Sequence, residues 1–426
     1  MELLSPAGNA EKLYYAYAYG ADAAYIGLKN FSLRVKADNF YDDEYKKVCQ
    51  LKNQFPGKKL FCALNISFHK SDIESFKNNI EYFRQYPIDA FIVQDLGIVP
   101  ILQKEFPNAS LHLSTQASCV NIEAAKMYRS IGFKRIVLGR EASLSEIRQI
   151  KDAVPDIELE AFCHGAMCIA YAGRCLMSAY LTGRSAQGGE CSHTCRWNFS
   201  VLQNAQSKND SDGFMGDISN ESVANAKRIA ESGSLMLQEE KRPNEAFPIY
   251  EGENFTAVLS SKDINMIHNL KDMKDAGIDS LKIEGRMKSI YYVALVTRAY
   301  RKALDALDGK ITNEDALPFI KELDNVAHRE STTGFYYNKE DANKTTTGAS
   351  DSPYLLAAKI GKCLNEKSET EIFRMAEKNK ANFEQEIWLF TKKHESLAKK
   401  IYKIILKKFL CQLRKKKIGI CTSFRH

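Results

Sequence analysis

Several signatures of common protein classes are missing from this chain of 426 residues. No uncharged apolar run approaches the roughly 18 residues of a membrane span, and the start lacks the basic-then-apolar pattern of a secretory signal. Neither the zinc-protease motif HExxH nor the serine-hydrolase motif GxSxG occurs. A Gly-rich phosphate loop after the first expected strand is also missing, which disfavours a dinucleotide-binding fold. We therefore expect a cytoplasmic protein without a membrane partner.

Positive charge is concentrated at one end of the chain. The whole sequence carries 60 Lys and Arg against 53 Asp and Glu, a formal net charge of +7. Residues 391–426 hold twelve Lys and Arg and one acid, Glu395, so the rest of the chain is slightly acidic. A nucleic-acid site on that body must be a local patch, because no general positive field surrounds it.

Short apolar stretches alternate with amphipathic helical patterns along most of the chain. Eight strands are expected, beginning near residues 2, 24, 60, 90, 110, 135, 157 and 280. Runs of Val, Ile, Leu and Ala are typical of parallel strands that are buried on both faces. Eight such units predict an α/β fold, a (β/α)8 TIM-barrel-like domain, with an open doubly wound sheet as the alternative.

The expected barrel domain covers residues 1–340, with a cysteine-bearing insertion at about 177–274 that lies over the C-terminal mouth of the barrel. Residues 341–426 are expected to form a small, atypical C-terminal domain. Its strand-like alternation fades and a basic tail follows, so we interpret this segment as truncated or frame-altered.

Polar residues follow most of the expected strands. The carboxyl ends of barrel strands face one cavity, where the active sites of this fold lie. The polar ring consists of Asn65, Gln94, Asp95, Ser114, Thr115, Gln116, Arg140, Glu141, His164, Glu284 and Arg286. Because guanidinium groups bind carboxylates bidentately, the arginines predict a site for a small anionic metabolite, although any one of them could form an ordinary surface ion pair. Its expected ligands are Arg34, Asn39, Gln116, Arg140 and Arg286.

Three residues are candidates for acid–base chemistry, namely Glu160, His164 and Glu284. His164 lies close to Cys163 and Cys168, so it could assist a cysteine nucleophile, hydrogen-bond to a metal-bound sulfur, or be a satisfied core histidine. No recognisable set of nucleophile, base and oxyanion donors can be assembled, so the catalytic base is left open.

Five of the eleven cysteines lie in one short segment, residues 160–197. Cys168 and Cys175 are seven residues apart, and Cys191 and Cys195 are four apart. On a helix both spacings would bring two thiols to one face, so the two pairs could enclose one metal centre. All-sulfur ligation suits an iron–sulfur cluster or a structural zinc, and the alternative is that these are small buried apolar residues.

The same segment resembles the signature of peptidase family U32, the collagenase-like proteins. The resemblance rests on Glu160-Ala-Phe162, Gly165-Ala-Met-Cys168, Gly173-Arg-Cys175 and Ser178, and on the runs LLSPAGN, GADAAYIG, LRVKADNF, HLSTQAS and SLKIEGRMKS. It covers about residues 1–360. The run GGECSHTCRW around Cys191 is similar to the branch of the family that hydroxylates the wobble uridine of tRNA.

The resemblance implies a tRNA-modifying enzyme that forms 5-hydroxyuridine in the anticodon region, with prephenate as co-substrate. It also implies a [4Fe-4S] cluster held by Cys168, Cys175, Cys191 and Cys195. Some relatives place a cluster cysteine after an SKDL motif, but the matching run here ends at Asn265 without one, which makes Cys195 the fourth ligand. The alternatives are a peptidase that acts on collagen-like or other proteins, and a non-catalytic protein that uses its metal as a staple.

Overall fold

The computed structural model describes residues 1–28, 31–33, 39–41, 43–196, 261–326 and 328–338, together with the backbone of short strands at 236–238, 246–248, 250–252, 255–257, 354–359 and 373–377. Arg34, Trp197 and the basic tail lie outside these residues. The chain divides into two units. The first comprises Met1–Ile320 and Arg329–Ala349, and the second comprises Lys321–His328 and Ser350–His426.

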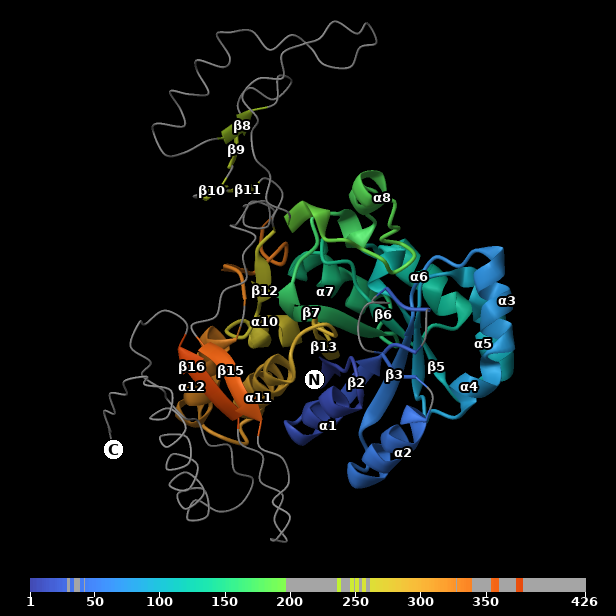
Figure 1. Cartoon of the computed structure of the whole chain (residues 1–426), viewed down its shortest axis with the longest axis horizontal. Helices are drawn as coiled ribbons and strands as arrows, with labels where there is room; N and C mark the ends of the chain where they lie inside the picture. Colours follow the sequence, from blue (N-terminus) through green and yellow to red (C-terminus); the bar gives the residue numbers. More distant parts are fainter. Residues whose placement is uncertain are drawn as a thin grey trace, which may run out of the picture. The chain divides into compact units, whose positions relative to one another are not determined.

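Eight parallel strands form a closed ring in the first unit (Figure 1). In order they are β1 (Glu2–Pro6), β2 (Ala23–Ile26), β3 (Lys59–Leu64), β4 (Ala90–Val93), β5 (Ser110–Leu113), β6 (Arg135–Val137), β7 (Glu158–Ala166) and β13 (Ser280–Ile283). Leu281 of β13 pairs with both Leu3 of β1 and Ala161 of β7, which closes the ring. The predicted (β/α)8-type barrel is confirmed, and the open sheet is excluded.

Helices follow the strands and surround the ring (Figure 1). They are α1 (Ala10–Ala18), α2 (Glu44–Gln54), α3 (Lys70–Asn78), α4 (Ile80–Arg84), α5 (Val99–Glu105), α6 (Ile122–Ile131), α7 (Leu144–Ala153), α10 (Leu270–Asp275) and α11 (Ile290–Leu307), with α12 (Asn313–Lys321) after them. Local sequence sets their ends. Ser143 and Glu146 form the capping box that starts α7, and Gly132, in the left-handed region, ends α6.

β7 is longer than the sequence predicts. The expected strand ends at Phe162, but the observed one continues to Ala166 because β12 (Asp263–Asn265) pairs antiparallel with this extension. β14 (Ser331–Thr332) then pairs with β12. β12 and α10 fall within the residues expected to form the insertion, yet β12 joins the barrel sheet and α10 contacts α7 and α11.

A β-bulge interrupts the pairing of β7 with β13. Phe162 pairs with Lys282, but the next pair is His164 with Ile283, so Cys163 is an extra residue. An extra residue reverses the side to which the following side chain points. Phe162 therefore lines the interior of the barrel mouth, whereas His164 contacts Tyr300 and Tyr292 of the surrounding helix α11.

The remaining strands are short antiparallel pairs. β8 (Met236–Gln238) pairs with β9 (Ala246–Pro248), and β10 (Tyr250–Gly252) pairs with β11 (Phe255–Ala257). In the second unit β15 (Tyr354–Lys359) pairs with β16 (Phe373–Glu377). Across the described residues, none of the helices combines the length and the apolar character needed to cross a bilayer.

Candidate active site at the barrel mouth

A cavity that opens to solvent lies at the carboxyl ends of the strands. Its polar lining consists of Asn65, Ser114, Thr115, Gln116, Arg140, Lys282, Glu284 and Arg286. Most of these side chains belong to the predicted ring of strand-end residues. Gln94, Asp95, Glu141 and His164 were expected in the same ring but do not line the cavity.

Arg140 follows β6 and presents a desolvated cation to the cavity. Its side chain is 9% exposed, and its guanidinium carbon lies 3.7 Å from the centre of the Phe162 ring. The nearest carboxylate oxygen, on Glu284, is 3.6 Å from Nη2, which is too long for a strong hydrogen bond. Arg140 Nε is buried without a hydrogen-bond partner. A buried donor in this state favours an incoming anion.

Arg286 follows β13 and is held against glycine-rich backbone. It is buried, and its Nη2 donates to Ser32 Oγ at 3.0 Å. A Cβ added to Gly27 would lie only 1.9 Å from Arg286 Nη1, so a larger residue at position 27 would displace the guanidinium. Asn39, buried and in the left-handed backbone region with φ of 51°, is part of the same cluster. The structure thus brings four of the predicted ligands to this end of the barrel, namely Asn39, Gln116, Arg140 and Arg286.

Gln116, in the 3-10 turn η2 (Thr115–Ala117), joins the cavity to residues 167–196, here called the cap. Its backbone oxygen accepts a hydrogen bond from Arg174 Nε at 2.8 Å. Its amide packs so closely on Gly173 that a Cβ there would lie 2.6 Å from Gln116 Nε2. Glu141 adds a second staple, because its Oε1 accepts from the Ala172 backbone N–H at 2.7 Å. The cap is therefore anchored at the rim of the cavity.

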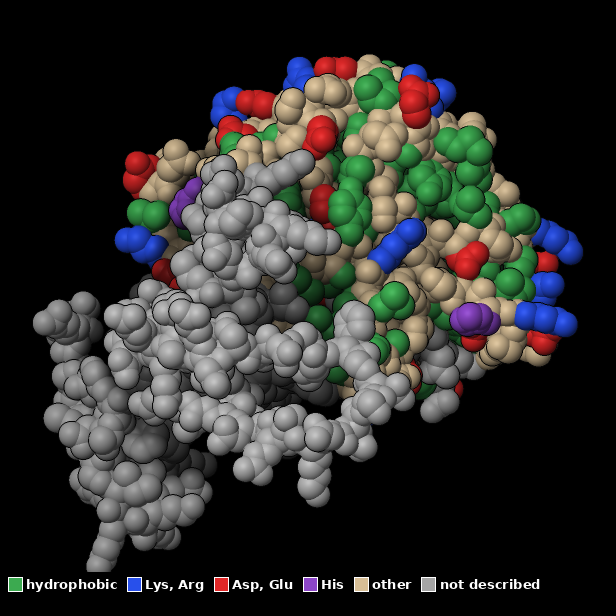
Figure 2. All heavy atoms as spheres, turned by 90° about the horizontal axis from the view of Figure 1, so that it is seen from above, with side chains coloured by type: hydrophobic (Ala, Val, Ile, Leu, Met, Phe, Trp, Pro, Cys, Tyr) green, Lys and Arg blue, Asp and Glu red, His purple; other side chains and the backbone are tan. Residues whose placement is uncertain are grey.

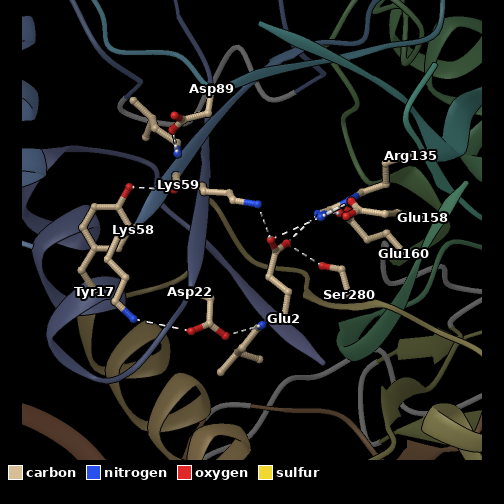
Figure 3. A network of polar contacts seen from close by, with 12 residues as sticks. Glu2, Tyr17, Asp22, Lys58, Lys59, Asp89, Arg135, Glu158, Glu160 and Ser280 are labelled. Atoms are coloured by element: carbon tan, nitrogen blue, oxygen red, sulfur yellow. Dashed lines mark hydrogen bonds and ion pairs between the residues drawn. The ribbon is translucent and has the colours of Figure 1, made fainter. Parts of the chain in front are cut away.

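The floor of the cavity is a buried network of ion pairs. Lys282 Nζ lies 2.6 Å from Glu160 Oε1 and 4.5 Å from the centre of the Tyr25 ring. The other oxygen of Glu160 lies 3.0 Å from Arg135 Nη1. Figure 3 shows Arg135 between Glu2, Glu158 and Glu160, at the amino ends of the strands. Glu160, a candidate for acid–base chemistry, is fully buried and already binds two cations.

The network also sets protonation states. Burial by itself raises the pKa of Glu2, but the hydrogen bond and charge of Arg135 outweigh it and lower the pKa overall. His112, in β5, packs edge-on against Phe61 inside the barrel. Burial, followed by the charges of Arg135 and Lys282, holds the pKa of His112 well below its usual value, so this ring is neutral at pH 7. Sequence reasoning missed His112 and the interior place of Lys282, although both occupy lumen-facing positions of expected strands.

The other two acid–base candidates occupy different environments. Glu284 lines the cavity beside Arg140, and 16% of its side chain is exposed. His164 lies outside the cavity, with its Nδ1 3.4 Å from Tyr300 Oη. Cys163 is fully buried, and its thiol donates to the backbone oxygen of Lys282 at 3.5 Å. Burial raises the pKa of Cys163 far above its ordinary value, which disfavours a nucleophilic thiolate.

The four cysteines proposed as metal ligands, Cys168, Cys175, Cys191 and Cys195, form no disulfide with one another and are half-buried within the cap. The cap consists of η3 (Tyr171–Gly173), α8 (Met177–Thr182) and η4 (Thr194–Arg196). Neither pair lies along one α-helix, because the cysteines flank or enter short 3-10 turns, so the helix spacing does not apply to them.

Hydrogen bonds connect the two halves of the cap. The Ser192 N–H donates to Ser178 Oγ at 2.9 Å, and the Thr182 and Ser192 hydroxyls lie 3.0 Å apart. Cys191 is thereby held next to α8. Within the residues that the structure describes, no three His, Cys, Asp or Glu side chains are gathered closely enough to hold a metal ion. The thiols share one segment but do not converge on one point.

Comparisons with known proteins agree across the barrel. The sequence model of peptidase family U32 matches residues 8–346. The "tRNA hydroxylation protein P" of Escherichia coli (strain K12) is 37% identical over 340 residues, which cover 78% of this chain and 74% of that protein. The "tRNA hydroxylation protein P1" of Bacillus subtilis (strain 168) is 35% identical over 381 residues, 89% of this chain and 80% of that protein. A 23S rRNA 5-hydroxycytidine synthase of Escherichia coli (strain K12) is 34% identical over 368 residues, 85% of this chain but 48% of that protein. The chain belongs to peptidase family U32.

Proposed function

We propose that this protein is an RNA-hydroxylating enzyme that converts the wobble uridine in the anticodon region of tRNA to 5-hydroxyuridine. The observation that carries the proposal is the extent of the similarity. Two relatives named as tRNA hydroxylation proteins match over 78% and 89% of this chain. The family model matches residues 8–346, a range that contains the cavity lining and the cap. The cavity lies at the strand ends, where enzymes with this barrel place their active sites.

The proposed co-substrate is prephenate, a small dicarboxylate. Arg140 and Arg286 line the cavity, and among the described lining residues Glu284 supplies the single carboxylate, so the lining favours an anion. Lys282 also lines the cavity, but its charge is paired with Glu160. Arg140 Nε is buried without a hydrogen-bond partner, and a carboxylate oxygen placed there would satisfy it. Ser114 and Thr115 add neutral hydroxyl groups to the lining, which suit the uncharged oxygens of such a ligand.

The proposed cofactor is an iron–sulfur cluster of the [4Fe-4S] type on Cys168, Cys175, Cys191 and Cys195. The donor set fits, because four half-buried thiols that form no disulfide lie on one segment, and hydrogen bonds from Glu141 and Gln116 anchor this segment at the cavity rim. Ligation requires these thiols to lie closer together than they do in the structure. When bound, the cluster would supply one-electron transfer beside the cavity. The alternative is that the same thiols bind a structural zinc ion.

The function is tested by mass spectrometry of tRNA nucleosides from a strain that lacks the gene. We expect the 5-hydroxyuridine-type nucleosides to disappear and to return when the wild-type gene is restored. Restoration with a Cys175→Ser variant should fail, whereas a Cys49→Ser variant, altered outside the cap, should succeed. Unchanged nucleosides in a strain without a paralogue would remove the proposal.

The cofactor is tested on protein purified without oxygen. We expect about four iron and four sulfide per chain and a broad visible absorption, as all-cysteine clusters give. The Cys175→Ser variant should lose most of the iron, while Cys49→Ser keeps it. Zinc in place of iron would show that the four thiols form a structural zinc site and not an iron–sulfur cluster.

A further inference from the structure

The cap carries an unusual concentration of exposed apolar side chains. In the described residues, large hydrophobic side chains that are at least 40% exposed occur at eleven positions, and five of these lie within residues 169–181. The five are Ile169, Tyr171, Leu176, Tyr180 and Leu181. Tyr180 is 89% exposed and Leu176 is 80% exposed, the two highest values of this group. Such clustering marks a binding surface rather than chance exposure.

The most exposed pair lies on one face of α8. Leu176 immediately precedes the helix, and the Tyr180 N–H donates to its backbone oxygen at 2.9 Å. Residues four apart on a helix are neighbours, so the Tyr180 ring and the Leu176 side chain form one surface. Figure 2, which looks down on the side where α8 lies in Figure 1, shows hydrophobic side chains in contiguous groups on this face.

This surface is held in place rather than tethered loosely. Ser178, on the opposite side of α8, is buried, and its oxygens bind the Ser192 N–H and the Thr182 hydroxyl. Gln187 Nε2 donates to the Gly173 oxygen at 3.2 Å, and the Gln187 oxygen in turn accepts from the Ser67 N–H of the barrel. Together with the staples from Glu141 and Gln116, these bonds give the exposed face a defined position beside the cavity.

The charges of the cap select the kind of partner. Residues 169–189 contain two arginines, Arg174 and Arg184, both exposed, and no Asp or Glu. Exposed aromatic rings beside arginine are typical of surfaces that bind single-stranded nucleic acid, because rings stack on bases and guanidinium groups bind phosphates. An interface for another protein would bury these rings without requiring a segment free of acids.

We propose that the exposed face of α8, centred on Tyr180 and Leu176, is the platform on which bases adjoining the modified nucleotide stack. The proposal rests on the proposed function, because it takes tRNA as the partner of the adjacent cavity. Tyr180 supplies the stacking ring, Leu176 extends the apolar surface, and Arg184 binds the phosphate backbone. Unpaired loop bases can reach this surface, whereas bases in a duplex cannot.

The test measures the affinity of the full-length protein for an anticodon stem-loop RNA by fluorescence anisotropy at one salt concentration. Tyr180→Ala is expected to weaken binding by about 5- to 150-fold, the range for loss of one base–aromatic stack. Tyr180→Phe, which keeps the ring, should bind like wild type. Met127→Ala is the matched control, because Met127 is an exposed apolar side chain of α6. Thermal unfolding should be unchanged in all three variants.

Arg184→Gln gives an independent measure. We expect weaker binding and a slope of log affinity against log salt that is smaller by about one unit, as for loss of one phosphate contact. Tyr180→Ala should leave that slope unchanged, because stacking releases no counterion.

Three outcomes overturn the platform. Tyr180→Ala and Leu176→Ala could bind RNA like wild type, the two variants could change only the oligomeric state in light scattering, or the wild type could bind no RNA. The last result also removes the proposed function. If the purified protein binds RNA in a way that depends on Tyr180, but the tRNA nucleosides of the deletion strain do not change, the platform stands and only the hydroxylase function is removed.

Discussion

The two ends of the barrel treat charge in opposite ways. At the amino end, Arg135 lies 2.6 to 3.0 Å from oxygens of Glu2, Glu158 and Glu160. At the mouth, among the described residues, the nearest carboxylate to Arg140 is 3.6 Å away, and Arg140 Nε and Gln116 Oε1 are buried without hydrogen-bond partners. A network that satisfies itself stabilises the fold, whereas buried groups without partners favour a ligand.

Lys282 connects the two ends. Its Nζ is paired with Glu160 below, while its side chain lines the cavity above. Anions that enter the cavity therefore meet a cation whose charge is already balanced, and the arginines at the rim carry the uncompensated attraction.

The largest loss of stability is expected when the ion-pair network at the amino end of the barrel is broken. Glu160→Gln leaves Lys282 and Arg135 buried without their shared counter-charge, so we expect the free energy of unfolding to fall by about 3–5 kcal/mol. Urea unfolding monitored by circular dichroism measures it. Glu158→Gln is the control, because Glu158 is 49% exposed and its loss should cost at most about 1 kcal/mol. Equal losses in the two variants would contradict the comparison.

At the mouth of the barrel the expected effect is on the binding of prephenate. Arg140→Gln should weaken the affinity for prephenate by about 10- to 150-fold, because a charge-assisted hydrogen bond is lost, while stability changes less than in Glu160→Gln. Titration calorimetry measures the affinity. Arg129→Gln, which removes a surface partner of Asp156, should bind prephenate like wild type. Unchanged affinity in Arg140→Gln would place the anion elsewhere.

A closely paired Asp and Arg near the mouth allow the comparison to be tested through the pH dependence of stability. Asp263 of β12 lies 2.9 Å from Arg329 Nε. Burial by itself raises the pKa of Asp263, but Arg329 outweighs it, so the pKa falls below its ordinary 3.8. Because the folded pKa is lower than the unfolded pKa, the stabilisation is complete above the unfolded value and is lost as pH falls through the folded one.

Unfolding free energy measured from pH 7 down to about pH 3 tests this pair. Asp263→Asn should lower stability by about 1–3 kcal/mol at pH 7 and should flatten the loss below about pH 4. If the unfolding free energy of the variant falls as steeply at low pH as that of the wild type, Asp263 does not contribute to the pH dependence.

The smallest effect is expected at an exposed pair of similar length. Lys126 Nζ lies 2.8 Å from Glu123 Oε1, but the two side chains are 52% and 81% exposed. Lys126→Ala should change the free energy of unfolding by less than about 0.5 kcal/mol, because water screens the pair. A loss that approached that of Glu160→Gln would mean that distance, not burial, decides the contribution.

Local sequence was a good guide to the strands and a poor guide to the directions of side chains after them. Each of the eight predicted strands is present, because aliphatic runs between helix stops report burial directly. His164 was expected at the cavity, but the bulge at Cys163 turns it toward Tyr300. A bulge depends on the pairing with β13, more than a hundred residues away, so nothing near His164 in the sequence reveals it.

The amino-acid sequence by itself determined the number and order of the strands, the polar character of the strand ends and the concentration of cysteines in one segment, because each follows from residue types at short range. Only the tertiary structure decided which of the charged residues neutralise one another. Glu160 and Lys282 lie 122 positions apart, and ring closure places them 2.6 Å apart beneath the cavity. Among the residues that the structure describes, the nearest carboxylate to Arg140 is that of Glu284, at 3.6 Å. Pairing of charges is a property of distance in space, and only the closed barrel sets that distance.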